Sequence, residues 1–251
     1  MSSYRKHPAL NQSLLKLLLD KTPAHFHHAR NNPDESETKC LILGRAIHCL
    51  ALEGLGEFQR RFAVMPDGIT RQSKEGKELY ARLSENGRTV LNSSEMDLIS
   101  NVDDSLHRSE SVRMLLEKGE AEKAVFGELE GLECKAQLDW WIPDSKIIVD
   151  LKTTEDASPE GFARSCAKYH YDLQAAIYLD ITGANYFLFV VVEKTAPYCT
   201  AIYEATPEVI ENGRAKYRKC FDIYRKCLES NNWHGYTDEI QQLQLPTWSV
   251  L

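Results

Sequence analysis

Residues 134–152 read CKAQLDWWIPDSKIIVDLK, and this stretch decides the fold. Apolar and β-branched residues stand on both sides of Asp144 and Ser145, which predicts two strands joined by a two-residue turn. The register of such a hairpin places Asp139 directly across from Asp150. The stretch therefore predicts a β-hairpin with two facing carboxylates.

These two carboxylates predict a metal site. Directly opposed side chains lie about 5 Å apart at Cβ, and two charges at that separation repel by roughly 3 kcal/mol at an effective dielectric constant of about 20. A divalent cation removes this cost, and carboxylate oxygens suit Mg²⁺ or Mn²⁺. Lys152 falls on the same strand face as Asp150 and can offset charge that develops on a phosphate.

The alternative is a solvated hairpin, in which Asp139 and Asp150 point at water and Lys152 pairs with either. An isolated D-x-K tripeptide favours this alternative. The apolar residues of 147–151, however, indicate a central buried strand, where an unpaired aspartate costs several kcal/mol. The flanking residues therefore favour a functional site.

The rest of the chain predicts helices on both sides of a set of strands. Helical spacing and capping signals mark residues 10–18, a start at Thr22 and Pro23, and helices over 38–53, 73–86 and 94–108. Strands follow at 121–130, 132–142, 146–153, 185–193 and 199–205, with helices at 158–168, 171–182 and 206–229. This order predicts an α/β (α+β) fold. We expect one domain over 1–251, with a mainly helical part at 1–118, a core at 119–230 and a tail at 231–251.

Composition excludes several classes of protein. The chain has 251 residues, a formal charge of −7 and seven scattered cysteines without a C-x-x-C pair. An iron–sulfur cluster or structural zinc site is therefore disfavoured, and we expect reduced thiols. No apolar run reaches the roughly 20 residues that cross a bilayer, so we expect a soluble, intracellular (cytoplasmic) protein with no membrane partner. The acidic balance requires any DNA contact to be local.

Two further spacings are candidates for the site. Gly44 stands one turn before His48 in the most apolar helix of the N-terminal half, which suggests that another backbone approaches closely and that His48 ligates the metal. A histidine that only packs in the core is the alternative. Gln174 and Tyr178 share a helix face, which is either a plain amphipathic face or a polar platform.

Cations gather at two places along the chain. Arg71, Lys74 and Lys77 surround a predicted helix start, where a phosphate or only water would sit. Arg45, in the same helix as His48, is a further candidate phosphate contact. The basic residues of 214–226 form either a DNA-binding patch or a solvated face.

The ordered motifs resemble a known nuclease superfamily. G-x-x-x-H, an aspartate before a hairpin, D-x-K and then Q-x-x-x-Y is the motif order of the RecB-like branch of the PD-(D/E)xK nucleases. The stretches TKCLILGRAIHCLALE, IIVDLKTTEDAS, YHYDLQAAIYLD and LQLPTW resemble the nuclease domain of exonuclease VIII, the RecE family of phage-type recombination exonucleases. The resemblance covers nearly the whole chain from Pro8 onward.

The resemblance implies roles for individual residues. Metal ligands would be His48, Asp139, Asp150 and the Leu151 carbonyl, with Glu122 at an acidic position that some relatives use for a second metal. Catalytic residues would be Asp139, Asp150, Lys152, Gln174 and Tyr178. Two departures stand out: Asp150 replaces the commoner glutamate, and residues 136–139 lack the glycine that often opens that motif.

The resemblance also implies a fold and an activity. We expect a mixed central sheet flanked by helices, and a Mg²⁺-dependent exonuclease (Mn²⁺ can substitute) that degrades double-stranded DNA from its ends, 5′ to 3′, through a metal-activated water. The single-stranded 3′ overhangs would serve phage-type homologous recombination beside an annealing protein of the RecT type. The alternatives are a repair nuclease of the Cas4 or AddB kind, with an iron–sulfur cluster, and a catalytically inactive DNA-end binding or ring-forming protein.

The charge of the chain adds an expectation about assembly. An acidic monomer cannot attract DNA by its net charge, so cations must gather where the duplex passes. A closed ring repeats one basic patch around a shared channel. We therefore expect a homo-oligomeric ring, a tetramer by resemblance.

Overall fold

The computed structural model describes residue 4, residues 6–33 and residues 38–245. The last residues of the predicted tail, including the end of LQLPTW, lie outside this part. Within the described residues a five-stranded mixed sheet has the order β3-β4-β5-β6-β7, in which only β5 and β6 are parallel. Its strands are β3 (Glu120–Leu129), β4 (Leu132–Ile142), β5 (Ile147–Thr154), β6 (Tyr186–Glu193) and β7 (Thr200–Glu204). The predicted mixed α/β fold is confirmed.

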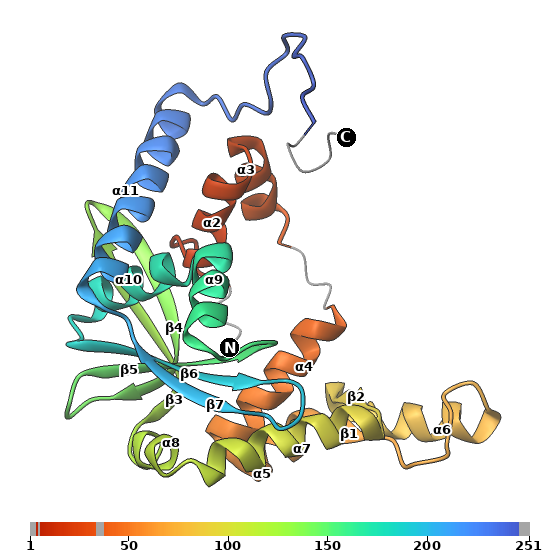
Figure 1. Ribbon diagram of the computed structural model, residues 1–251. Helices are drawn as coiled ribbons and strands as arrows, with labels where there is room; N and C mark the ends of the chain where they lie inside the picture. Colours follow the sequence, from red (N-terminus) through yellow and green to blue (C-terminus); the bar gives the residue numbers. More distant parts are fainter. Residues whose placement is uncertain (1–3, 5, 34–37, 246–251) are drawn as a thin grey trace.

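Helices cover both faces of this sheet (Figure 1). One face carries α2 (Gln12–Asp20), α3 (Pro23–Asn31), α9 (Pro159–Tyr169), α10 (Tyr171–Thr182) and α11 (Pro207–Ser230). The other carries α4 (Lys39–His48), the π-helical turn η1 (Cys49–Glu53), α5 (Gly54–Arg61), α7 (Ser93–Arg108) and α8 (Glu110–Leu115). Successive residues of β5 alternate between the two cores, Ile148 on the α10 side and Val149 on the α4 side.

The predicted register of the β4–β5 hairpin is confirmed. Ile142 pairs with Ile147 in an antiparallel ladder. Continuing that ladder places Asp139 opposite Asp150. On the other side of β4, the β3–β4 register continues through Glu122, which places this glutamate opposite Asp139. Asp139 therefore stands between two acidic neighbours on adjacent strands.

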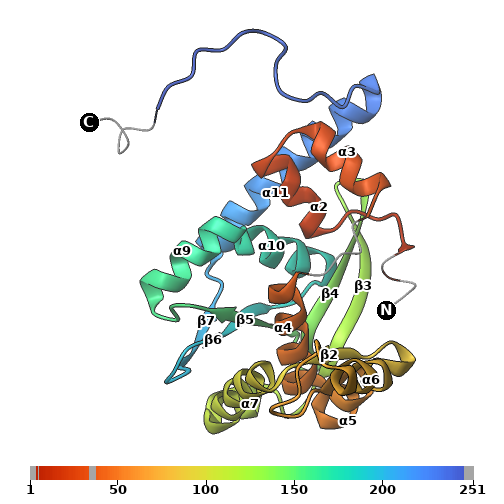
Figure 2. The ribbon, with the colours of Figure 1, turned by 90° about the vertical axis from the view of Figure 1, so that its right-hand side faces the viewer.

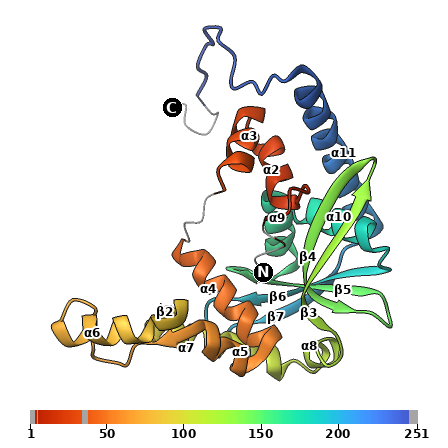
Figure 3. The same ribbon diagram turned by 180° about the vertical axis from the view of Figure 1, so that it is seen from behind.

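The β3–β4 hairpin extends beyond the rest of the sheet and reaches α11 (Figure 3). At its tip Glu130 forms ion pairs with Arg218, at 3.0 Å, and with Arg225, at 3.9 Å. The hairpin also contributes Leu129, Cys134 and Ala136 to the core under α10 and α11. These contacts hold β4, and with it Asp139, against the helical layer.

The N-terminal part departs from the helix-only prediction. Two short parallel strands, β1 (Phe62–Val64) and β2 (Thr89–Leu91), flank α6 (Lys74–Leu83) and the short 3₁₀ turn η2 (Glu85–Gly87). Three-residue apolar runs do not distinguish a strand from a buried helix segment, which is why the sequence pattern missed them. Figures 1 and 2 show α6 projecting away from the sheet.

Local start and stop signals are borne out within a few residues. Thr38, Ser73 and Thr206 cap α4, α6 and α11 through their side-chain oxygens. The predicted helix over 38–53 ends at Gly54, whose φ of +84° breaks it, but its last turn widens into η1. Among the described residues, no helix combines the length and the apolar character needed to span a membrane.

Candidate metal centre

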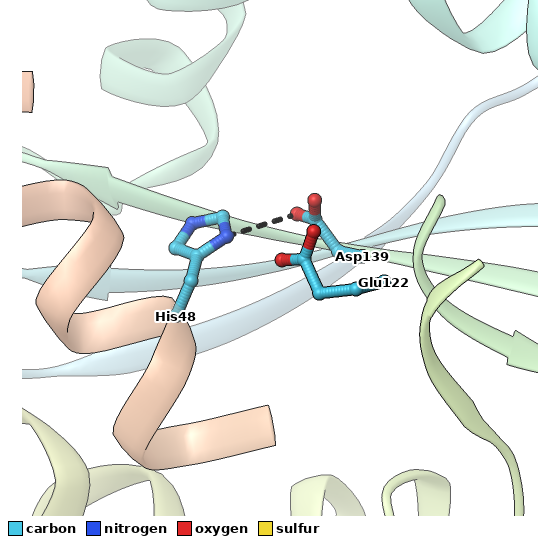
Figure 4. A group of neighbouring side chains, drawn as sticks. All are labelled: His48, Glu122 and Asp139. Carbon is cyan, nitrogen blue, oxygen red and sulfur yellow. Dashed lines mark ion pairs between the residues drawn. The ribbon is translucent and has the colours of Figure 1, made fainter. Parts of the chain in front are cut away.

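Three side chains from different elements converge beside the sheet (Figure 4). His48 is the last residue of α4, Glu122 belongs to β3 and Asp139 to β4. One ligand atom from each lies within 4.8 Å of the others. His48 Nδ1 is 3.5 Å from Asp139 Oδ2. A nitrogen and two carboxylates at this separation form a candidate metal centre.

The backbone is irregular at two of these residues. Directly after His48 the α-helix changes to the π-helical turn η1, a form that frequently occurs at functional sites. Glu122 has a φ of +54° inside a strand, a conformation that costs of order 1–3 kcal/mol for a residue other than glycine. Such strain persists where the surrounding structure enforces it. Here the β3–β4 pairing keeps the same register before and after Glu122.

The electrostatics of the centre favour a cation. Burial, followed by the charge of Asp139, raises the pKa of Glu122 to about 7. Gln137 Nε2 donates to Glu122 Oε2 at 2.5 Å, and the Leu151 amide donates to Asp139 Oδ2 at 2.9 Å. Among the described residues, neither carboxylate has an ion pair with a lysine or arginine. The donor set therefore fits a divalent cation, which would supply the missing positive charge.

Asp150 lies next to the centre in a different environment. It is 1% exposed, and Gln174 Nε2 donates to its Oδ1 at 2.5 Å. Its Oδ2 forms an ion pair with Lys152, whose Nζ also donates to Gln174 Oε1 at 3.2 Å. Burial raises the pKa of Asp150 to about 6, against the opposing effect of Lys152. Asp150, Lys152 and Gln174 thus form a closed polar triangle.

The structure brings three of the predicted metal ligands together in one group. Glu122, not Asp150, joins His48 and Asp139 in the compact group. Asp150 lies opposite Asp139 in the continued register but outside this group, and its strand neighbour Leu151 contacts Asp139 through its amide. The ligand role of Asp150 and of the Leu151 carbonyl stays a prediction.

Gln174 and Tyr178 have different surroundings although they share a face of α10. Gln174 joins the triangle with Asp150 and Lys152. Tyr178 is 5% exposed and packs against Phe187, and burial holds the pKa of its hydroxyl well above its usual value. Gln174 therefore contacts the site residues directly, whereas Tyr178 packs in the adjoining core.

The expected reason for Gly44 is wrong. A Cβ placed on Gly44 would meet no atom within 4 Å. The glycine lines an open groove of about 340 Å³ between α4 and the end of β5. No other backbone of the described residues approaches it, and the His48 side chain is 24% exposed instead of enclosed in a crowded interior.

The predicted phosphate contacts do not gather at the metal centre. Arg71 donates to the Val90 carbonyl and stacks on Tyr80, so its guanidinium supports the α6 excursion. Lys74 and Lys77 are exposed on α6, on the excursion that Figures 1 and 2 show away from the sheet.

The other candidate cations also have particular surroundings. Arg45 is exposed on α4, one turn before the helix end at His48. In α11, intramolecular ion pairs occupy Arg214, Lys216, Arg218 and Arg225. Most of the basic stretch over 214–226 therefore holds the fold together.

Comparison with known proteins identifies the family. Residues 11–246 match a family described as a PDDEXK-like domain of unknown function, DUF3799. The chain belongs to this PDDEXK-like family. The match spans nearly the whole chain and confirms the prediction of a PD-(D/E)xK nuclease domain. None of the curated proteins matches the chain.

Comparison with solved structures finds one that shares the fold. A protein from Eubacterium rectale, described as a proposed exonuclease, has a TM-score of 0.66 and 17% identity, covering 95% of this chain and 90% of its own. A phage-related exonuclease from Haemophilus somnus has a TM-score of 0.38 and 13% identity, covering 80% of this chain and 99% of its own. An alkaline exonuclease from Laribacter hongkongensis has a TM-score of 0.32 and 11% identity, covering 65% and 87%. The first of these shares the overall fold of this PDDEXK-like chain.

The cysteines disfavour an iron–sulfur cluster. All seven lie within the described residues, and none belongs to the metal-ligand group found there. Four are buried in the cores as thiols. An iron–sulfur cluster requires thiolates brought close together.

Sequence reasoning missed two residues beside Lys152. Tyr171 begins α10 and places its ring 4.6 Å from Lys152 Nζ. Lys16 of α2 places its own Nζ 5.5 Å from the centre of the same ring. The available signal was a single cation among leucines, since Lys16 stands between Leu15 and Leu17 in the first predicted helix.

Proposed function

We propose that this PDDEXK-like chain is a Mg²⁺-dependent exonuclease that hydrolyses phosphodiester bonds at the ends of double-stranded DNA. The observation that carries the proposal is the meeting of His48, Glu122 and Asp139 beside the Lys152 ammonium. The family supports the nuclease reaction. The exonuclease mode is supported by the fold shared with the proposed exonuclease from Eubacterium rectale and by the sequence resemblance to the RecE family.

Each residue has a role that follows from its surroundings. His48, Glu122 and Asp139 would hold the cation, with Asp150 as a further carboxylate at its edge. A bound divalent cation would make a water more acidic and offset negative charge on the phosphate. Mn²⁺ should substitute for Mg²⁺, because carboxylate oxygens suit both cations.

Lys152 is held charged at the reacting phosphate. Burial alone would lower its pKa, but Asp150 and Asp139 outweigh burial and raise the pKa above its usual value. Asp150 and Gln174 hold the ammonium in place. The group therefore needs little reorganisation when negative charge develops on the phosphate. Gln174 is a positioning residue, because it contacts both the carboxylate and the ammonium.

The finer parts of the proposal rest on the resemblance to the RecE family. We propose 5′ to 3′ degradation that leaves single-stranded 3′ overhangs, which a RecT-type annealing protein then uses in recombination. Such a reaction takes place where the DNA is, in the cytoplasm.

We also propose a homo-oligomeric ring, a tetramer by resemblance. The segment after α11 supports intermolecular contacts, since it leaves Ile240, Leu243 and Leu245 at least 65% exposed. Apolar side chains gathered in this way are a feature of association surfaces. The formal charge of −7 adds a reason for several subunits to share one channel.

The experiment is digestion of linear duplexes labelled at the 5′ or the 3′ end, with Mg²⁺ or with EDTA. Lys152→Ala protein, purified in parallel, controls for contaminating nucleases. We expect Mg²⁺-dependent release of the 5′ label by the wild type and none by the variant. Equal digestion by both proteins, or no digestion of any duplex in Mg²⁺ or Mn²⁺, would overturn the proposal. Release of the 3′ label before the 5′ label would contradict only the proposed direction of degradation.

A further inference from the structure

Lys16 is held close to the catalytic lysine by the packing of α2. Leu15 and Leu18 bury this helix in the core against α10 and α11. Asp20 Oδ1 lies 2.9 Å from His170 Nε2 at the junction of α9 and α10. Lys16 is four residues before Asp20, so both side chains lie on one helix face. The contact of Asp20 therefore accompanies the position of Lys16 at Tyr171, the first residue of α10. Figure 2 shows α2 beside α10.

Two ammonium groups share the ring of Tyr171. Lys152 Nζ lies 4.6 Å and Lys16 Nζ 5.5 Å from the ring centre. Each distance is within the roughly 6 Å at which a cation interacts with an aromatic face. Tyr171 begins α10, three residues before Gln174, which contacts Lys152. The ring thus places Lys16 in the same neighbourhood as the site.

Lys16 has no ion pair or hydrogen bond with any residue that the structure describes. Three acids act on the charge of Lys16, and each has another partner. Asp150 contacts Lys152 and Gln174, Asp172 pairs with Lys216, and Asp20 lies beside His170. Burial and then the charge of Lys152 lower the pKa of Lys16 to about 8. A half-buried cation that has only a ring contact and stands near a second cation costs free energy, which an added anion would recover.

A cavity adjoins Tyr171. Its volume is about 360 Å³, and its lining carries the cations Arg164, Lys168 and Lys194 together with the acids Glu155 and Asp156. Thr153 and Lys194 also line the groove at Gly44 on α4. The two hollows therefore lie on either side of Thr153, the residue that follows Lys152, and of Lys194.

We propose that Lys16 binds a non-scissile phosphate of the DNA strand whose neighbouring phosphodiester lies at Lys152. The inference rests on the proposed nuclease function. Tyr171 keeps the two ammonium groups apart and faces the strand between them. Lys16 is a binding residue here and takes no part in bond cleavage.

The experiment measures DNA binding and turnover for Lys16→Ala, Lys16→Gln and Lys16→Arg. Lys21→Ala is the matched control. Lys21 is an exposed lysine at the C-terminal cap of the same helix, and its substitution removes the same charge. Binding to a linear duplex is measured by fluorescence anisotropy in Ca²⁺ over a salt series, with intact label verified after each titration. Turnover in Mg²⁺ and thermal unfolding are measured on the same proteins.

We expect Lys16→Ala and Lys16→Gln to weaken binding about tenfold and to reduce the log–log salt slope by about 0.7–0.9, the value for one phosphate contact. KM should rise while kcat stays within about threefold of the wild-type value, as expected when an interaction of equal strength in the ground state and the transition state is lost. Lys16→Arg should restore most of the affinity, and Lys21→Ala should match the wild type. Tm should stay equal or rise, because a buried like-charge contact disappears.

Two outcomes separate this inference from the proposed function. A wild type that neither binds nor cleaves DNA overturns both. An active wild type whose Lys16→Ala and Lys16→Gln forms keep the affinity and salt slope of Lys21→Ala overturns only the role of Lys16. A lower Tm with an unchanged salt slope likewise overturns it, because that result is expected of a purely structural lysine.

Discussion

Replacement of Glu122 by glutamine should stabilise the metal-free protein while it weakens metal binding. Burial and Asp139 raise the pKa of Glu122 from 4.5 to about 7. At about 1.4 kcal/mol per pKa unit this shift corresponds to about 3 kcal/mol, and partial exposure reduces the expected effect to about 2 kcal/mol. Glutamine keeps the size of the side chain and its contact with Gln137 but cannot ionise.

The sign of the effect follows from the proton balance. Between about pH 4.5 and pH 7 the folded protein binds the Glu122 proton more tightly than the unfolded chain does, so wild-type stability falls as pH rises through this window. The advantage of Glu122→Gln should be small near pH 5 and complete near pH 8. For a chain of this size about 2 kcal/mol corresponds to a Tm difference of about 4–8 °C.

Thermal unfolding in EDTA at about pH 5 and about pH 8 measures this difference. Glu128→Gln is the control, since Glu128 is an exposed residue of the same strand. Added Mg²⁺ should then raise the Tm of the wild type at about pH 8 and that of Glu122→Gln much less. Equal Tm values for Glu122→Gln and wild type at about pH 8 in EDTA, or equal gains from Mg²⁺, would refute the reasoning.

Three further predictions concern the site and the assembly. Lys152→Ala should lower kcat at least about 100-fold but keep the Mg²⁺ affinity that calorimetry measures. Asp139→Ala should lose both the activity and the Mg²⁺ affinity. Retained activity in either variant would contradict the assignment. His48→Ala should weaken Mg²⁺ affinity about tenfold or more with smaller effect on DNA affinity in Ca²⁺, and a normal Mg²⁺ isotherm would exclude His48 as a ligand. Truncation after Ser230 should convert a homo-oligomer to smaller species, as measured by light scattering. The processivity of the full chain should fall steeply between about 50 and 200 mM salt. A full chain that is monomeric would exclude the ring.

Local signals were sufficient for the longer elements and for the central hairpin, although they missed the short strands β1 and β2. The turn at Asp144 and Ser145 and the alternation of β5 establish which residues of neighbouring strands face one another, because strand period and turn geometry act over a few residues. Helix caps such as Thr38 are equally local. The order of the motifs pointed in addition to the PDDEXK-like family.

Contacts between distant segments were less predictable. The basic stretch of α11 read as a possible DNA surface, but Arg218 and Arg225 hold the tip of the β3–β4 hairpin. Nothing in the residues around Arg218 indicates that Glu130 will come to lie beside it. Gly44 was expected to permit a close backbone contact, yet it opens onto a groove.

The sequence by itself determined the strand order within the hairpin, the facing of Asp139 and Asp150, and the residue types available for a metal and a catalytic ammonium. Tertiary structure decided which of these candidates meet, with Glu122 beside His48 and Asp139 and Asp150 beside Lys152. It alone showed that Lys16 reaches Tyr171. The reason is physical: register and capping arise from backbone geometry over short separations. The site, in contrast, is assembled by the burial of apolar helix faces on both sides of one sheet, which brings together side chains far apart along the chain.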